Sequence, residues 1–164
     1  MKLVIAEKPS VGKTIADVVG ATTKKEGYIE GNGYIVSWCF GHLVELEAPD
    51  YYIRKDSTQE NISWNLEELP IVPDRWQFTL SEDKGIKKQF NTLKKLMLSD
   101  KVNTIICATD AGREGECIFR YVYNYARCNK YVERLWVSSL EESAVREGLN
   151  CMKPDTEYDL LFES

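Results

Sequence analysis

Short apolar runs alternate with stripes of apolar side chains at helical spacing along the chain. Residues 3–6 and 104–108 are apolar runs of strand length, and such runs predict strands that are buried on both faces. Residues 132–137 predict another strand. Helical spacing marks four further segments, which are 10–20, 81–98, 113–126 and 139–149. The succession of strand, helix and strand predicts an α/β fold with a mostly parallel sheet and helices on both faces.

The N-terminal half departs from this alternation in two places. Residues 28–30 and 34–38 flank Gly31-Asn32-Gly33, and this pattern predicts a β-hairpin. Residues 44–80 are rich in proline, aromatic and charged residues and have little periodicity, so they predict an irregular excursion from the sheet.

Local signals predict where the helices and the domain end. Ser10 is the expected N-cap of the first helix, and Ser139 with Glu142 forms the pattern of a capping box. Pro154 ends the regular pattern. We therefore expect one domain over residues 1–153, with 154–164 beginning the connection to a following domain.

Composition fits a soluble globular protein. The chain has 164 residues, of which 43% are hydrophobic and 29% charged. No apolar run approaches the ~20 residues of a membrane span, and Met1-Lys2 leads directly into the first predicted strand, so a signal peptide is not expected. Five scattered cysteines without a CxxC pair argue against a disulfide framework and a zinc site, which favours the cytoplasm. The net charge of −5 argues only mildly against a nucleic-acid partner, because a total says little about a local patch.

Acidic residues follow the two apolar runs. Glu7 comes after the first and Asp110 after the second, with Glu114 one helical turn further on. If these strands are neighbours, the acids meet at the carboxyl edge of the sheet, where ligands bind in such folds. A carboxylate cluster suits Mg²⁺, which takes oxygen ligands and keeps waters to share with a phosphate. Spacing alone supports equally well a set of solvated acids, with Glu114 complementing the helix dipole.

Lys8, Lys13 and Arg113 lie beside these acids. Cations among metal-holding carboxylates suit a phosphodiester site, since phosphate charge must be neutralised from several sides. Ordinary surface ion pairing is the alternative interpretation. Gly12-Lys13-Thr14 matches the end of a P-loop, but the first glycine of that motif would fall on Glu7, which would repel phosphates. ATP is therefore not expected to bind.

Two aromatic residues and one histidine complete the candidates. A lone histidine after a strand, such as His42, is more often structural than catalytic. Trp64 and Trp76 are more often packing groups than stacking platforms, although their place in an irregular excursion is compatible with a surface function.

Two motifs together resemble the Toprim domain of type IA DNA topoisomerases, in their topoisomerase III branch. They are IAEKPSVGKTIADVV, which begins at Ile5, and ATDAGREGE, which begins at Ala108. Three further stretches fit the same family, namely WCFGHLVEL, WNLEELPIVPDRWQ and RLWVSSL. The resemblance covers essentially the whole chain and implies the Toprim variant of a Rossmann-like fold.

The resemblance implies an ATP-independent enzyme that changes DNA topology. In this family a tyrosine attacks a phosphodiester of single-stranded DNA, another strand passes through the gap, and the break is resealed. None of the nine tyrosines lies in a segment that resembles the site of this nucleophile. The chain is therefore expected to be an N-terminal part of a longer enzyme, inactive alone in strand cleavage, whose partners are single-stranded DNA and the remaining domains.

Roles are implied for residues that match the motifs. Glu7 resembles the acid that protonates the leaving 3′ oxygen, Lys8 a phosphate contact, and Arg113 the arginine beside the motif's acids; these three are the expected catalytic residues. The expected metal ligands for Mg²⁺ are Glu7, Asp110 and Glu114. The expected DNA contacts are Lys8, His42, Trp64 and Arg113.

The chain departs from the family pattern at one position. Gly112 stands where the D-x-D-x-E pattern has its second acid. One ligand fewer predicts a metal with more water and weaker binding, held mainly by Glu7 and Asp110. Two alternatives stay open, a Toprim nuclease or primase module, which the WNLEELPIVP stretch disfavours, and a non-catalytic nucleotide-binding regulatory domain.

Overall fold

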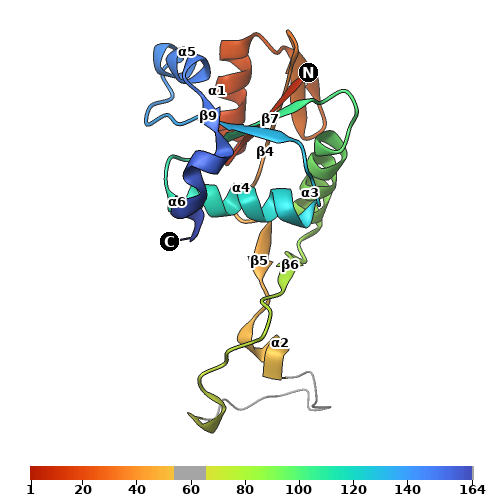
Figure 1. Cartoon of the computed structure of the whole chain (residues 1–164). Helices are drawn as coiled ribbons and strands as arrows, with labels where there is room; N and C mark the ends of the chain where they lie inside the picture. The colour runs from red at the N-terminus through yellow and green to blue at the C-terminus, as the bar shows by residue number, and fades with distance from the viewer. Residues whose placement is uncertain (54–65, 164) are drawn as a thin grey trace.

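A seven-stranded sheet forms the centre of the molecule (Figure 1), and the computed structural model describes residues 1–53 and 66–163. The strand order is β2-β3-β4-β1-β7-β8-β9. Strands β4, β1, β7 and β8 are mutually parallel, whereas β2–β3, β3–β4 and β8–β9 pair antiparallel. The strands are β1 (Lys2–Ala6), β2 (Thr23–Lys25), β3 (Tyr28–Gly31), β4 (Tyr34–Trp38), β7 (Thr104–Ala108), β8 (Tyr131–Arg134) and β9 (Lys153–Pro154). The predicted mostly parallel sheet is confirmed.

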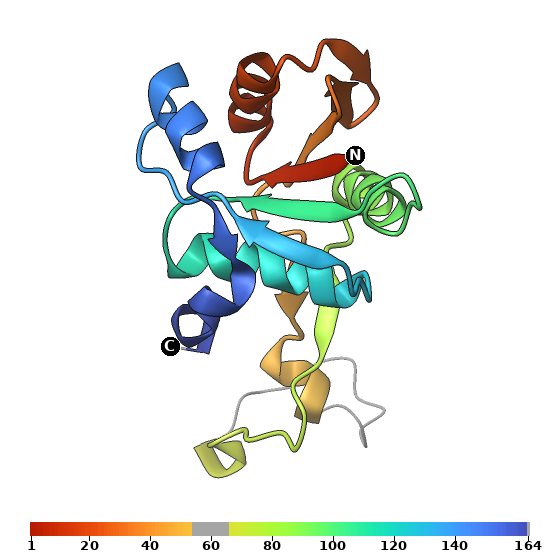
Figure 2. The same ribbon diagram turned by 45° about the horizontal axis from the view of Figure 1, so that its top comes forward.

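Helices cover both faces of this sheet (Figure 2). They are α1 (Pro9–Val19), α3 (Lys84–Met97), α4 (Arg113–Tyr125) and α5 (Glu142–Asn150). Successive side chains of a strand point to opposite faces. Leu3 and Ile5 of β1 accordingly pack with the apolar side chains of α3 and α4, and Val4 and Ala6 pack with those of α1 and α5. This two-sided burial explains why the central strands are uninterrupted apolar runs.

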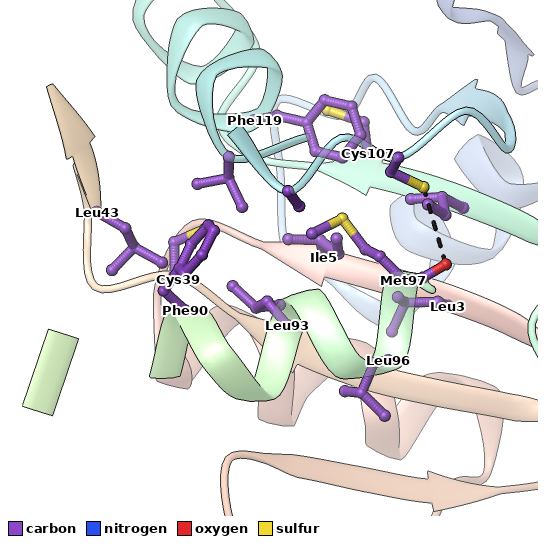
Figure 3. Packing of buried hydrophobic residues seen from close by; sticks show 14 of the residues in the cluster. Leu3, Ile5, Cys39, Leu43, Phe90, Leu93, Leu96, Met97, Cys107 and Phe119 are labelled. Carbon is purple, nitrogen blue, oxygen red and sulfur yellow. Dashed lines mark hydrogen bonds between the residues drawn. The ribbon is translucent and has the colours of Figure 1, made fainter. Parts of the chain in front are cut away.

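The larger core lies between the sheet and α3–α4. Figure 3 shows Leu3 and Ile5 of the sheet with Phe90, Leu93 and Met97 of α3, and each of the five is at most 3% exposed. Removing a side chain of this size from such a core typically costs about 2–5 kcal/mol. The core therefore fixes β1, and with it the residues that follow β1 at the sheet edge.

The predicted N-cap of the first helix was wrong by two residues. Helix α1 begins at Pro9 and has Lys8 as its N-cap, so Ser10 lies inside the helix. Proline suits the first helical position because its fixed φ is helical and its missing N–H would have had no partner there. The predicted end is confirmed, since Gly20 closes α1 with φ of 76°.

The predicted capping box of the last long helix was also wrong. Helix α5 begins at Glu142 with Glu141 as N-cap, and the Glu141 side chain forms no capping hydrogen bond. Ser139 Oγ instead accepts a hydrogen bond from Glu141 N at 3.2 Å. Ser139 lies two positions before the N-cap, too early in the chain to reach the free N–H groups of the helix, and it stabilises the preceding turn.

The predicted hairpin is confirmed as β3–β4, with Asn32 and Gly33 at positive φ in the turn. The excursion is more regular than expected. Its described residues contain a two-stranded antiparallel sheet, a short α-helix and a 3₁₀ turn. These are β5 (Val44–Leu46), α2 (Pro49–Ile53), η2 (Leu66–Glu68) and β6 (Phe78–Leu80). Together they project from the body of the molecule beyond α4 (Figure 1). Trp64 lies outside the described residues.

The C-terminal residues return to the body of the molecule. After β9, which joins the edge of the sheet, η3 (Asp155–Tyr158) and α6 (Asp159–Glu163) follow, and α6 packs against α4. The expected boundary after residue 153 stays a prediction. None of the described helices has the length and apolar character needed to cross a membrane.

Candidate active site

Glu7 and Asp110 meet at the carboxyl edge of the sheet. Strands β1 and β7 are parallel neighbours and pair Ala6 with Ala108, so the residues that follow them emerge side by side. Glu7 Oε2 accepts a hydrogen bond from Asp110 N at 3.1 Å. The Glu7 residue is only 6% exposed. The expected adjacency of the two strand ends is confirmed.

The Lys8 ammonium lies close to both acids. Its Nζ is 3.4 Å from Glu7 Oε1 and 3.6 Å from Asp110 Oδ2. The side chains of Lys8 and Asp110 are 55% and 59% exposed, so the group opens to solvent. The Asp110 carboxylate, and next the Glu7 carboxylate, raise the pKa of Lys8. The edge of the sheet thus carries a cation between two acids, accessible from outside.

His42 and Glu114 form a second pair near the first. His42 Nε2 is 3.6 Å from Glu114 Oε1, on a side chain that is 80% exposed. The segment that carries His42 is tied to the first group, since Gly41 N donates to Glu7 O at 3.3 Å. The structure therefore pairs Glu114 with His42, while Glu7, Lys8 and Asp110 form a group of their own.

The side chains at the sheet edge can be compared with the ligands that Mg²⁺ requires. Within residues 1–53 and 66–163, no group of three or more His, Cys, Asp or Glu side chains is placed to hold a metal ion. Glu7 and Asp110 nevertheless offer carboxylate oxygens, and Mg²⁺ is commonly held by one or two carboxylates together with waters and phosphate oxygens. This pair fits Mg²⁺ by its chemistry. The three-carboxylate set that includes Glu114 stays a prediction.

A glycine sets the tight turn between Asp110 and helix α4. A Cβ atom at Gly115 would lie 2.1 Å from the Asp110 carbonyl oxygen, so no other residue fits without displacing the backbone. Thr109 Oγ1 closes the same turn by donating to Gly115 O at 2.7 Å. At Gly112, by contrast, a Cβ would meet nothing within 4 Å, and φ is 164°, which is ordinary extended backbone. The missing acid at this position is therefore not imposed by the fold.

A buried arginine holds the loop that carries Asp110. Arg134 Nε donates to Glu116 Oε2 at 3.0 Å, and both side chains are completely buried. The Arg134 guanidinium also donates to the carbonyl oxygens of Thr109 at 2.8 Å and of Asp110 at 2.9 Å. Since buried charges need partners, this arginine fixes the backbone directly before and at Asp110.

Neither member of this pair was assigned a role from the sequence. Glu116 ends the TDAGREGE motif, and Arg134 lies in the stretch 132–137 that was predicted as a strand. The available signal was the charge itself, because arginine and glutamate are almost never fully buried unless they are paired.

Arg120 extends the network to the C-terminal residues. Its Nε donates to Glu116 Oε1 at 2.9 Å, and its Nη1 donates to Asp159 Oδ1 at 2.6 Å. Asp155 also faces Arg120, with 3.4 Å between Oδ2 and Nη2. Burial, opposed by Arg120 and reinforced by Glu116, raises the pKa of Asp155 to about 6. A chain of charges thus links the segment 155–159 to the Asp110 loop.

The remaining predicted residues lie around this group. Arg113 is the first residue of α4 and is exposed. Lys13 is exposed on α1, and only two residues separate β1 from that helix, too few for a loop that surrounds phosphates.

The parallel sheet with acids at its carboxyl edge defines a class of domain. The profile of the Toprim domain family matches residues 2–140, and the chain belongs to this family. Proteins named DNA topoisomerase 3 are similar to it over 162 residues, with 46% identity for that of Bacillus thuringiensis (strain Al Hakam) and 42% for that of Bacillus subtilis (strain 168). Each alignment covers 99% of this chain and 21% of the relative. The resemblance to the topoisomerase III branch is confirmed.

A solved structure shares the fold. The full-length topoisomerase I from Thermotoga maritima matches 90% of this chain and 20% of its own, with a TM-score of 0.55 and 22% sequence identity. The chain therefore spans about a fifth of the length of the proteins that it resembles.

Proposed function

We propose that this chain supplies the metal and acid–base part of the active site of a type IA DNA topoisomerase of the topoisomerase III branch, acting in the cytoplasm. The observation that carries the proposal is the position of Lys8 Nζ, 3.4 Å from Glu7 and 3.6 Å from Asp110 at the ends of adjacent parallel strands. The similarity to proteins named DNA topoisomerase 3 over 99% of the chain supports it.

The reaction needs a nucleophile from another domain of the same polypeptide. A tyrosine hydroxyl gives up its proton to solvent and attacks the phosphorus of a single-stranded DNA phosphodiester, and the bond from phosphorus to the 3′ oxygen breaks as the phosphotyrosine forms. Glu7 donates the proton that the leaving 3′ oxygen takes up, and it removes this proton again when the break is resealed. The phosphotyrosine ester conserves the energy of the broken phosphodiester bond, so no ATP is needed to reseal the strand.

The cations of the site bind the DNA backbone. Lys8 contacts a non-bridging phosphate oxygen, and its exposure leaves it accessible to a strand that lies across the sheet edge. Arg113 and His42 contact the same strand at the start of α4 and beside β5, and Trp64 supplies an aromatic contact. Asp110 and Glu7 would hold Mg²⁺, with Glu114 nearby, and the ion would neutralise charge on the phosphate.

Metal binding can be tested on this chain directly. Titration calorimetry with Mg²⁺ should give a Kd at least tenfold higher for Asp110→Asn than for the unmodified chain, because one of two carboxylate ligands is lost. Asp100→Asn is the matched control, since Asp100 is an exposed aspartate that follows α3. If both variants bind Mg²⁺ like the unmodified chain, Asp110 is not a ligand.

Strand cleavage tests the reaction class. With Mg²⁺ and a single-stranded oligonucleotide, this chain alone should leave the DNA intact, and cleavage without a covalent protein–DNA adduct would favour a Toprim nuclease instead. In a polypeptide that includes the following domains, Glu7→Gln should slow formation of the covalent adduct by 100-fold or more while DNA affinity changes little. Equal losses of cleavage and binding would remove the acid–base role of Glu7.

A further inference from the structure

A second cleft lies away from the Glu7–Lys8–Asp110 group. Its volume is about 470 Å³, and it is lined by Phe78, Lys94, Tyr121, Asn124, Tyr125 and Arg127. These residues come from β6, the end of α3, the second half of α4 and the residue after α4's C-cap. Helix α4 begins at the active site with Arg113, and its rise places Tyr121 and Tyr125 roughly 12 and 18 Å further along the axis.

Aromatic rings form the walls of this cleft. Phe78 packs against Tyr121 with ring centroids 4.8 Å apart, and Phe90 of the core supports Tyr125 at 5.4 Å. Phe78 and Tyr125 are still 40% and 39% exposed. The rings are thus held in place from behind while part of their surface faces solvent, which is an arrangement suited to stacking against flat partners.

The polar lining of the cleft carries positive charge only. Lys94 and Arg127 are exposed, and neither side chain forms an ion pair with another residue in the described part of the chain. Helix α3, which contributes Lys94, has five lysines and no acid among its fourteen residues. The whole chain has a net charge of −5, so this concentration of cations is local. The cleft therefore attracts an anionic partner.

Arg127 occupies a backbone conformation that favours glycine. Its φ is 57°, and it follows the C-cap of α4, where glycine in this left-handed conformation usually ends a helix. A residue with a side chain is less stable there than glycine. The chain thus accepts a conformational cost while placing a guanidinium at the cleft.

From these observations we propose that the cleft binds a segment of single-stranded DNA. Bases stack on Phe78, Tyr121 and Tyr125, and Lys94 and Arg127 contact the phosphates, which is how proteins bind single strands without reading their sequence. The choice of DNA as the ligand rests on the proposed function. The inference adds to that function a second contact with the strand, away from the Glu7–Lys8–Asp110 group.

Binding of a fluorescein-labelled 20-nucleotide oligo(dT) to the whole chain, followed by anisotropy over a range of salt concentrations, tests the inference. Lys94→Gln and Arg127→Gly should each raise Kd several-fold and reduce the slope of log K against log salt by about 0.7. Tyr125→Leu should raise Kd about 5- to 100-fold with the salt slope unchanged, since stacking on a base is lost and no phosphate contact is. An abasic oligonucleotide should bind the unmodified chain and Tyr125→Leu equally.

The variants include their own controls for folding. Arg127→Gly places the favoured residue at a left-handed position, so its Tm should not fall and a loss of binding reports on the guanidinium. Arg146→Gln removes an exposed cation on α5, across the sheet from α3 and α4, and should leave Kd within twofold of the unmodified chain.

Two results would overturn the inference. If the three cleft variants bind the oligonucleotide like the unmodified chain, the cleft is not a DNA contact. If Lys8→Gln alone loses binding in that case, the proposed active site is still supported. Absence of binding by the unmodified chain at about 20 mM salt would also exclude the cleft. The proposed function would in that case be judged separately, by the Mg²⁺ titration of Asp110→Asn.

Discussion

Arg134 Nε and Glu116 Oε2 lie 3.0 Å apart, and neither side chain has any exposed surface. The two residues come from β8 and α4, and the arginine also binds the carbonyl oxygens of Thr109 and Asp110. A buried pair of this kind is poor support for stability by itself, because desolvation offsets the attraction. Its hydrogen bonds to the Asp110 backbone indicate a positioning role instead.

Removal of one partner should therefore be costly. Glu116→Leu leaves a buried guanidinium with its carboxylate gone, and we expect it to lower the free energy of unfolding by about 3–5 kcal/mol, measured by urea denaturation. Glu142→Leu breaks the exposed pair with Arg146 and should cost less than about 1 kcal/mol. Equal costs for the two variants would contradict the burial argument.

The planar shape of the Arg134 guanidinium can be tested separately from its charge. Arg134→Lys keeps a cation but offers no planar fork that reaches several carbonyl oxygens at once. We expect the variant to fold with reduced stability and to bind Mg²⁺ more weakly, because Asp110 loses its support. If calorimetry gives the same Mg²⁺ affinity for a folded Arg134→Lys chain, the fork does not position Asp110.

Two glycines in the same motif should respond oppositely to a methyl group. Gly115→Ala places Cβ against the Asp110 carbonyl oxygen and should cost about 1–3 kcal/mol or more, since backbone must move. Gly112→Ala meets open space in extended backbone and should change stability by less than about 0.5 kcal/mol, because lower unfolded-state entropy offsets a poorer N-cap. Thermal unfolding of both variants checks the contrast, and similar Tm losses would refute it.

The architecture was predictable because burial imposes a period on the sequence. Strands β1 and β7 lie between two helical layers and therefore appear as continuous apolar runs, and their adjacency brings Glu7 to Asp110. Strands β5, β6 and β9 have two or three residues each, which is too short for any periodicity to register.

The site was predictable only where its residues are close together in the sequence or follow strands that are neighbours. Lys8 adjoins Glu7 in the sequence, so its proximity to the acids was expected. Arg134 and Glu116 are 18 residues apart and meet only because β8 runs beside β7 under α4. The contact of Glu114 with His42 likewise depends on the path of the chain after β4, which no local pattern specifies.

Restoring the absent acid should strengthen metal binding. At Gly112 an aspartate has both the space and an allowed backbone, and this position is the N-cap of α4, which aspartate favours. We expect Gly112→Asp to retain stability and to lower the Kd for Mg²⁺ several-fold in calorimetry, because a third carboxylate joins Glu7 and Asp110. Gly112→Asn caps the helix without adding charge, and equal Mg²⁺ affinities for the two variants would argue against a metal at this edge.

The charge network at the C-terminal segment should make stability depend on pH. Burial raises the pKa of Asp155 from 3.8 to about 6 in the folded chain, so the folded state holds this proton more tightly than the unfolded state. The resulting stabilisation is present in full below pH 4 and is lost as the pH rises through about 6. Asparagine resembles the protonated carboxyl at every pH and removes this dependence.

Urea denaturation at pH 4, 5, 6 and 7 tests that expectation in matched variants. The stability of Asp155→Asn relative to the unmodified chain should rise between pH 4 and 6 and then level off, because over that interval residue 155 of the unmodified chain holds its proton in the folded state and has lost it in the unfolded state. Asp100→Asn, at an exposed position outside the network, should show no such trend. A difference between Asp155→Asn and the unmodified chain that stays constant from pH 4 to 7 would mean that Asp155 titrates alike in the folded and unfolded states.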